Sequence, residues 1–77
     1  MAKVNTVEKF AVMRHGNVKR VVKAWMYYSV FNFCRENGET RQRSDEIAKW
    51  ARDQAKAGEK YETSGYSITL EEREVAG

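Results

Sequence analysis

The chain has 77 residues, of which 42% are hydrophobic and 32% charged, with a formal net charge of +3 and one cysteine. This length predicts one small domain, and the apolar content excludes a disordered protein. A single cysteine excludes an internal disulfide framework and a zinc site built from several thiolates, so we expect a reducing, cytoplasmic location.

Residues 6–15 form the first candidate element, and their pattern fits two structures. As a helix, the segment places Val7 and Phe10 on one face. As a strand, it alternates Phe10 and Val12 with Ala11. We expect the short helix, with the strand as the alternative.

Residues 17–37 also allow a helix or strands. A helix would start at Asn17 and end before Gly38, with Trp25 on its apolar face. The alternative is a hairpin that turns at Asn37-Gly38, but its return strand, residues 39–43, has no apolar side chain. We therefore expect a helix.

Residues 44–57 carry the clearest helix pattern. Ser44 is a suitable N-cap, Ile47 and Trp50 begin an apolar stripe, and Gly58 follows as a stop signal. These features predict an amphipathic helix.

Residues 60–71 alternate apolar and polar side chains on both sides of Ser64-Gly65, which predicts a β-hairpin. The expected fold is thus α+β, a small single domain over residues 1–77. Its helix-rich part, residues 6–57, holds two or three helices and is followed by this C-terminal β-hairpin. Residues 71–77 form a short acidic tail.

The sequence offers no catalytic set. Met13-Arg14-His15-Gly16 resembles the Arg-His-Gly signature of histidine phosphatases, which implies a histidine that accepts a phosphoryl group. That chemistry needs a second histidine, and His15 is the only one in the chain. Cys34 lies in an apolar run that would raise its pKa, so it is a poor nucleophile. We expect no enzyme, no metal and no cofactor.

The basic residues are unevenly distributed. Residues 1–35 carry seven lysines and arginines against one acidic residue, whereas residues 36–77 carry seven against ten. The expected basic patch lies at the start of the second helix, where it would receive an anion, with a loop as its extension. Its residues are Arg14, Lys19, Arg20, Lys23, Arg41 and Arg43.

Residues 24–34 are almost uniformly apolar, yet the run is too short to span a membrane. A helix that is apolar on all sides needs more cover than a small domain supplies. We therefore expect a partner-binding aromatic face formed by Trp25, Tyr27, Tyr28 and Phe31.

Together these features predict a small binding protein, a regulatory or inhibitory module that docks on a larger protein or nucleoprotein complex. In size and style the chain is similar to phage and mobile-element accessory proteins. The alternative is a basic nucleic-acid-binding protein that contacts phosphates through the face formed by Lys19, Arg20 and Lys23. A homodimer formed through the aromatic face is compatible with either function.

Overall fold

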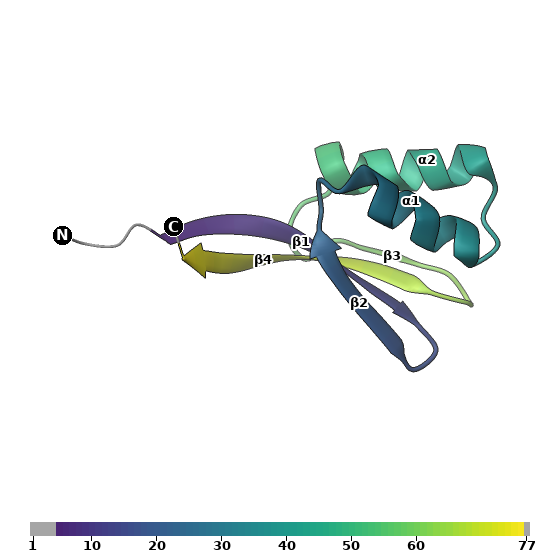
Figure 1. The fold of residues 1–77 in the computed structure, drawn as a ribbon, viewed down its shortest axis with the longest axis horizontal. Helices are drawn as coiled ribbons and strands as arrows, with labels where there is room; N and C mark the ends of the chain where they lie inside the picture. Colours follow the sequence, from purple (N-terminus) through teal and green to yellow (C-terminus); the bar gives the residue numbers. More distant parts are fainter. Residues whose placement is uncertain (1–4, 77) are drawn as a thin grey trace.

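A computed structural model describes residues 5–76 as two layers, a four-stranded antiparallel sheet and two helices that cover one of its faces (Figure 1). The elements are β1 (Asn5–His15), β2 (Val18–Lys23), α1 (Tyr27–Glu36), α2 (Arg41–Lys49), the π-helical turn η1 (Trp50–Gln54), β3 (Lys60–Glu62) and β4 (Ser67–Ala76). The expected order of helices followed by a hairpin is therefore wrong. Two strands precede the helices, and one sheet contains all four strands described.

Residues 6–15, expected as a helix, belong to the central strand β1. Ala11 and Met13 are fully buried in the core, and Val12, which points to the opposite face, is only 2% exposed. A helix buries one stripe and would leave part of this set in water. As a strand between β2 and β4, the segment buries all three side chains, including Val12 on the face without helices, and the strand is therefore the stable form here.

A two-residue turn, Gly16-Asn17, joins β1 to β2 and replaces the expected start of a long helix at Asn17. Gly16 has a φ of +58°, and glycine at the first central position is typical of a type II′ hairpin turn. His15 and Val18, which flank the turn, are directly paired. Segment 17–37 is therefore divided between β2 and α1.

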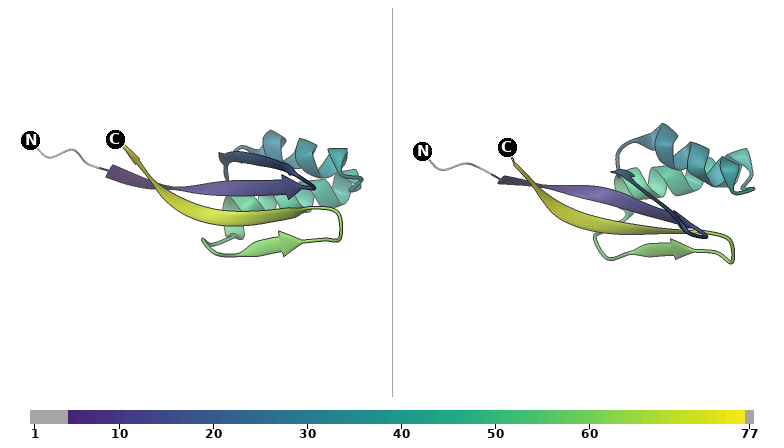
Figure 2. Two further views of the ribbon diagram at one scale, coloured as in Figure 1. Left: turned by 90° about the horizontal axis from the view of Figure 1, so that it is seen from below. Right: turned by 60° about the horizontal axis from the view of Figure 1, so that its bottom comes forward.

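The strand order is β2-β1-β4-β3, so the first and last strands lie side by side in the centre of the sheet (Figure 2). β1 pairs with β4 from Asn5 opposite Ala76 onward. The predicted antiparallel pairing within residues 60–71 is present, but β3 and β4 form one half of the larger sheet. Residues 71–76, expected in an acidic tail, continue β4.

The second helix begins earlier than expected. Thr40 is its N-cap, because the Thr40 hydroxyl accepts a hydrogen bond of 3.1 Å from the Arg43 N–H. Ser44, the expected cap, lies inside α2 and is fully buried.

The end of this helix also differs from the expected residue 57. After Lys49 the backbone widens into η1, where the Ala55 N–H donates to the Trp50 carbonyl at 2.7 Å. The ammonium group of Lys9 donates to the Ala55 carbonyl at 2.6 Å and so joins the helix end to β1.

The core fills the space between the helices and the sheet. The residues that it buries are Ala11, Met13, Ala24, Val30, Phe33, Cys34, Ile47, Ala48, Ala51, Ala55, Tyr66, Ile68 and Leu70. α1 contributes Val30, Phe33 and Cys34, and its remaining aromatic side chains face α2 or solvent. The apolar run is thus covered in part by α2 and the sheet.

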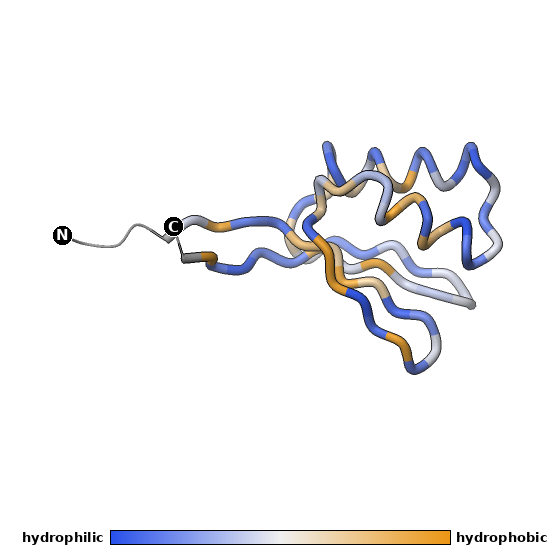
Figure 3. Tube along the Cα trace, viewed as in Figure 1, coloured by the Kyte–Doolittle hydropathy of each residue, from blue (hydrophilic) through white to orange (hydrophobic). Residues whose placement is uncertain are grey.

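Beyond the helical layer, β1 and β4 continue as a two-stranded arm, residues 5–9 paired with residues 72–76. The arm accounts for much of the 49 Å length of the molecule, against 25 Å and 18 Å in the other directions (Figure 1). Figure 3 shows that the arm is largely hydrophilic, unlike the strand segments beside the helices.

Candidate docking site

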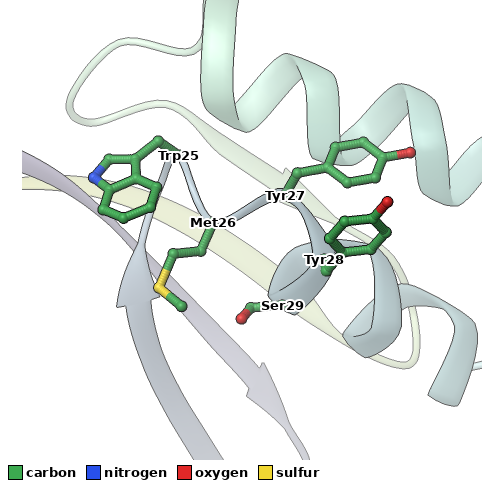
Figure 4. Close-up of a pocket in the computed structure, with 5 residues that line it drawn as sticks. All are labelled: Trp25, Met26, Tyr27, Tyr28 and Ser29. Atoms are coloured by element: carbon green, nitrogen blue, oxygen red, sulfur yellow. The ribbon is translucent and has the colours of Figure 1, made fainter.

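Three large apolar side chains are exposed together where β2 joins α1. Trp25 is 60% exposed, Met26 39% and Tyr28 75%. We call these three residues the aromatic patch. With Tyr27 and Ser29 they line a shallow hollow of about 310 Å³, in which the Trp25 and Tyr28 rings lie on opposite sides of Met26 (Figure 4).

A tight link between strand and helix exposes these side chains. The Ala24 N–H closes the sheet by donating to the Lys9 carbonyl at 2.9 Å. The Met26 N–H then donates to the Lys23 carbonyl at 3.0 Å, and the Tyr27 N–H to the Trp25 carbonyl at 2.9 Å. The chain therefore reverses within three residues, and the link leaves Trp25 and Met26 outside the core.

Tyr27 and Phe31, which we expected on the docking face, lie against the protein instead. Their rings stack with centroids 5.7 Å apart, and both pack on the core. The Tyr27 hydroxyl donates a hydrogen bond to Asp45 on α2. This bond raises the pKa of Tyr27 and lowers that of Asp45.

Tyr27 also positions the patch. Its ring meets that of Tyr28 edge to face, with centroids 5.1 Å apart at 86°. The guanidinium carbon of Arg52 lies 5.8 Å from the Tyr27 centroid. Tyr28 is therefore supported on one side by a ring that is itself anchored to α2 and η1.

The expected basic patch does not gather at a helix N-terminus, because Lys19, Arg20 and Lys23 lie in β2. A strand sends alternate side chains to opposite faces, so Lys19 and Lys23 point to the face without helices. Arg20 points to the helical side, where it lies 3.8 Å from Glu36. Arg14 is directly opposite Lys19 and shares its face.

Two further members of that set are elsewhere. Arg41 and Arg43 belong to α2, and Arg43 is bonded to Glu46 at 3.1 Å and to the Tyr61 hydroxyl at 3.3 Å. These bonds raise the pKa of Arg43, and the bond that Arg43 donates to Tyr61 has the largest effect. Arg43 is therefore engaged within the protein, where it links α2 to β3 of the sheet.

Lys23 connects the open face of the sheet to the aromatic patch. Its ammonium nitrogen lies 3.3 Å from a Glu8 carboxylate oxygen and 5.8 Å from the centroid of the Trp25 ring. Within residues 5–76, neither Arg14 nor Lys19 forms an ion pair. The positive charge that is available to a partner on this face is therefore concentrated in Arg14 and Lys19.

The two groups considered for chemistry, His15 and Cys34, lie in different environments. His15 is exposed at the β1–β2 turn. Cys34 is fully buried, and burial raises its pKa to about 11. Among residues 5–76, no three histidine, cysteine or acidic side chains cluster as metal ligands. No helix in the same range combines the length and the apolar run that crossing a membrane requires.

Comparisons with protein-family models, with curated proteins and with solved structures found no match to this chain.

Sequence reasoning placed Trp25 and Tyr28 on the docking face but did not single out Met26. It also missed the exposed edge of β2. A signal for the edge was present in Gly16-Asn17, a turn pair that follows an apolar alternation and precedes residues 18–23.

Proposed function

We propose that this chain is a non-enzymatic binding module that docks on a larger protein through the aromatic patch. The observation that carries the proposal is the joint exposure of Trp25, Met26 and Tyr28 around one hollow. Large exposed aromatic side chains are costly in water and are the residues most enriched at interface hot spots. The module regulates or inhibits by occupying a surface of its partner.

The charges beside the patch indicate the chemistry of the partner. Lys23 lies over Trp25, and Lys19 and Arg14 continue the same sheet face. We therefore expect a partner whose apolar contact is bordered by carboxylates. A reducing, cytoplasmic setting is part of the proposal and is supported by the single, buried thiol of Cys34.

Nucleic acid is the second candidate partner. It is favoured by one observation, the Arg14–Lys19 pair without carboxylate neighbours on the face next to Trp25. Against it, Lys23 and Arg20 already face Glu8 and Glu36. Of the four cations Arg14, Lys19, Arg20 and Lys23, only Arg14 and Lys19 are then left to neutralise phosphates, which dominate nucleic-acid affinity.

Site-specific photo-crosslinking in cells tests the docking site. We would place a benzophenone side chain at Tyr28 and, as a control, at the exposed Glu62 of β3. We expect a protein adduct from position 28 that survives nuclease and is absent from position 62. Adducts to nucleic acid, adducts between copies of this chain, or equal adducts from both positions would contradict the proposal.

The partner identified in this way allows a quantitative test. Trp25→Ala combined with Tyr28→Ala should weaken binding on the order of 1,000-fold, because hot-spot aromatic residues contribute about 2 kcal/mol or more each. Val7→Ala, which removes an exposed apolar side chain on the arm, is the control and should leave affinity unchanged. Raising the salt concentration from about 50 to 200 mM should lower the affinity far less than the ~10³-fold loss that is typical of an interface with many phosphate contacts.

A further inference from the structure

The outer edge of β2 exposes unused backbone groups. β2 is the first strand in the sheet order, so it has a neighbour on one side only. The Ala24 N–H bonds to β1, and backbone groups in an antiparallel strand alternate in direction. Lys19, Val21 and Lys23 therefore direct their N–H and C=O groups away from the sheet. Of these groups, the Lys23 carbonyl already accepts from Met26.

This edge is longer than the opposite one. β2 pairs regularly with β1 along all six of its residues, whereas β3, at the other edge, has three. Natural sheets protect their edges against pairing by short strands, bulges, proline or charged side chains, lysine above all, and β2 carries Lys19 and Lys23 as the charged device. β3 is protected by being short, since it has three residues. In the described part of the chain, β2 has no bulge or proline, and its neighbour α1 covers one face rather than the edge (Figure 2).

The side chains of β2 define what would pair there. On the face without helices, Lys19, Val21 and Lys23 form a row in which the valine is 37% exposed. In an antiparallel pair, directly opposite residues share a face and interact, so opposite charges and apolar pairs stabilise the pairing. The matching strand has an acidic residue opposite Lys19, an apolar residue opposite Val21, and a second acidic residue opposite Lys23, whose ammonium group it would share with Glu8.

A second copy of this chain does not match the edge. Two β2 strands centred on Val21 would set Lys19 of each copy opposite Lys23 of the other. Centred on Arg20, they would set two arginines face to face. Like charges directly opposite are destabilising. The same cations that repel a copy would attract an acidic strand.

We infer that β2 binds an extended acidic segment of another protein as a fifth strand, with the pattern acidic-x-apolar-x-acidic. Strand addition of this kind takes affinity from the main chain and specificity from alternate side chains. The inferred site adjoins the aromatic patch and shares Lys19 and Lys23 with its charged border, but strand pairing at the β2 edge does not depend on the proposed function.

The test uses the capped peptide Thr-Glu-Thr-Val-Thr-Glu-Thr as the probe, titrated into the full chain and followed by amide NMR. We expect shifts and slowed exchange at the outward amides of Lys19, Val21 and Lys23. A peptide with lysine in place of glutamate should not bind.

Two modified peptides separate strand addition from simple charge attraction. N-methylation of the central valine removes a donor that points to β2 and should abolish binding. N-methylation of the threonine that follows alters an amide that points away, so binding should be retained. Both experiments leave the protein itself unchanged, so misfolding of a variant cannot produce the result.

A protein variant tests the register. Lys19→Glu should lower the affinity for the glutamate peptide by about fivefold. It should raise the affinity for a peptide that has one lysine at the position facing residue 19. The new carboxylate lies opposite Arg14, so the fold should be retained. The inference is overturned if both N-methylated peptides bind alike or if no amide in β2 responds. Shifts confined to Trp25 and Tyr28, or a dimer of the chain alone formed through β2, would also overturn it.

Discussion

Ser44 provides a test in which two interpretations of the same residue predict opposite signs. Its side chain is fully buried in α2, and its hydroxyl oxygen has no hydrogen-bond partner within the described structure. The N-cap function belongs to Thr40. Ser44→Ala therefore removes a buried polar atom without removing a hydrogen bond, and we expect the variant to be more stable than the wild type.

The magnitude follows from three contributions. An unpaired buried hydroxyl costs about 1–3 kcal/mol, and alanine is favoured over serine inside a helix by roughly 0.5 kcal/mol. The small cavity left by the missing oxygen atom destabilises the variant by about 1 kcal/mol at most and so reduces this gain. The net expectation is a stabilisation of about 1 kcal/mol, which raises the Tm by about 4–8 °C for a domain of this size.

Urea unfolding followed by far-UV circular dichroism measures this change. Thr40→Ala is the matched variant and should lose about 1 kcal/mol, because it removes the true cap. The m-value should be the same for both variants and the wild type, so that midpoints compare directly. A loss of stability of about 1 kcal/mol in Ser44→Ala, with no effect of Thr40→Ala, would refute this account of the helix start.

Two other changes test the hairpin turn and the buried thiol. Gly16→Ala should lower the free energy of unfolding by about 1 kcal/mol, because Gly16 has a positive φ. Gly65→Ala, at a turn with open space around it, should leave stability unchanged in the same urea assay. Equal effects of the two variants would contradict the turn assignment. Burial raises the pKa of Cys34 to about 11, above the ~8.5 of a cysteine in an unfolded chain. The buried neutral thiol therefore makes its full contribution to the free energy of unfolding below about pH 8.5, and this contribution declines as the pH rises to about 11. The wild type should therefore lose more stability than Cys34→Ala between pH 8 and pH 11, and parallel pH profiles would argue against a shifted thiol.

Local patterns predicted the parts of the fold that local interactions determine. The alternation around Ser64-Gly65 led to the correct pairing of β3 with β4. The stripe that includes Ile47 predicted helix at the right place, although the cap lies four residues earlier than expected. The boundary was missed because serine and threonine are both good caps, and the choice depends on which side chain the core buries.

The first half of the chain depends on distant contacts. Residues 6–15 have apolar side chains on both faces, and only pairing with β2 and β4 makes that pattern favourable. Gly16-Asn17 could have indicated a hairpin. Three of the six residues in β2 are cations, however, and such a composition is not typical of a strand. The orientations of Trp25 and Tyr27 depend on the residue at which α1 begins, which the uniformly apolar run does not specify.

The central position of β1 and β4 has a consequence for synthesis. β1 and β2 can form their hairpin once residues 5–23 have left the ribosome, but the other side of β1 stays open until β4 appears. Closing that long loop costs entropy and gives the fold many non-local contacts, which favours slow folding. A nascent chain that stalls before residue 67 would expose both edges of an apolar hairpin, and chaperones and proteases would then recognise it as incomplete.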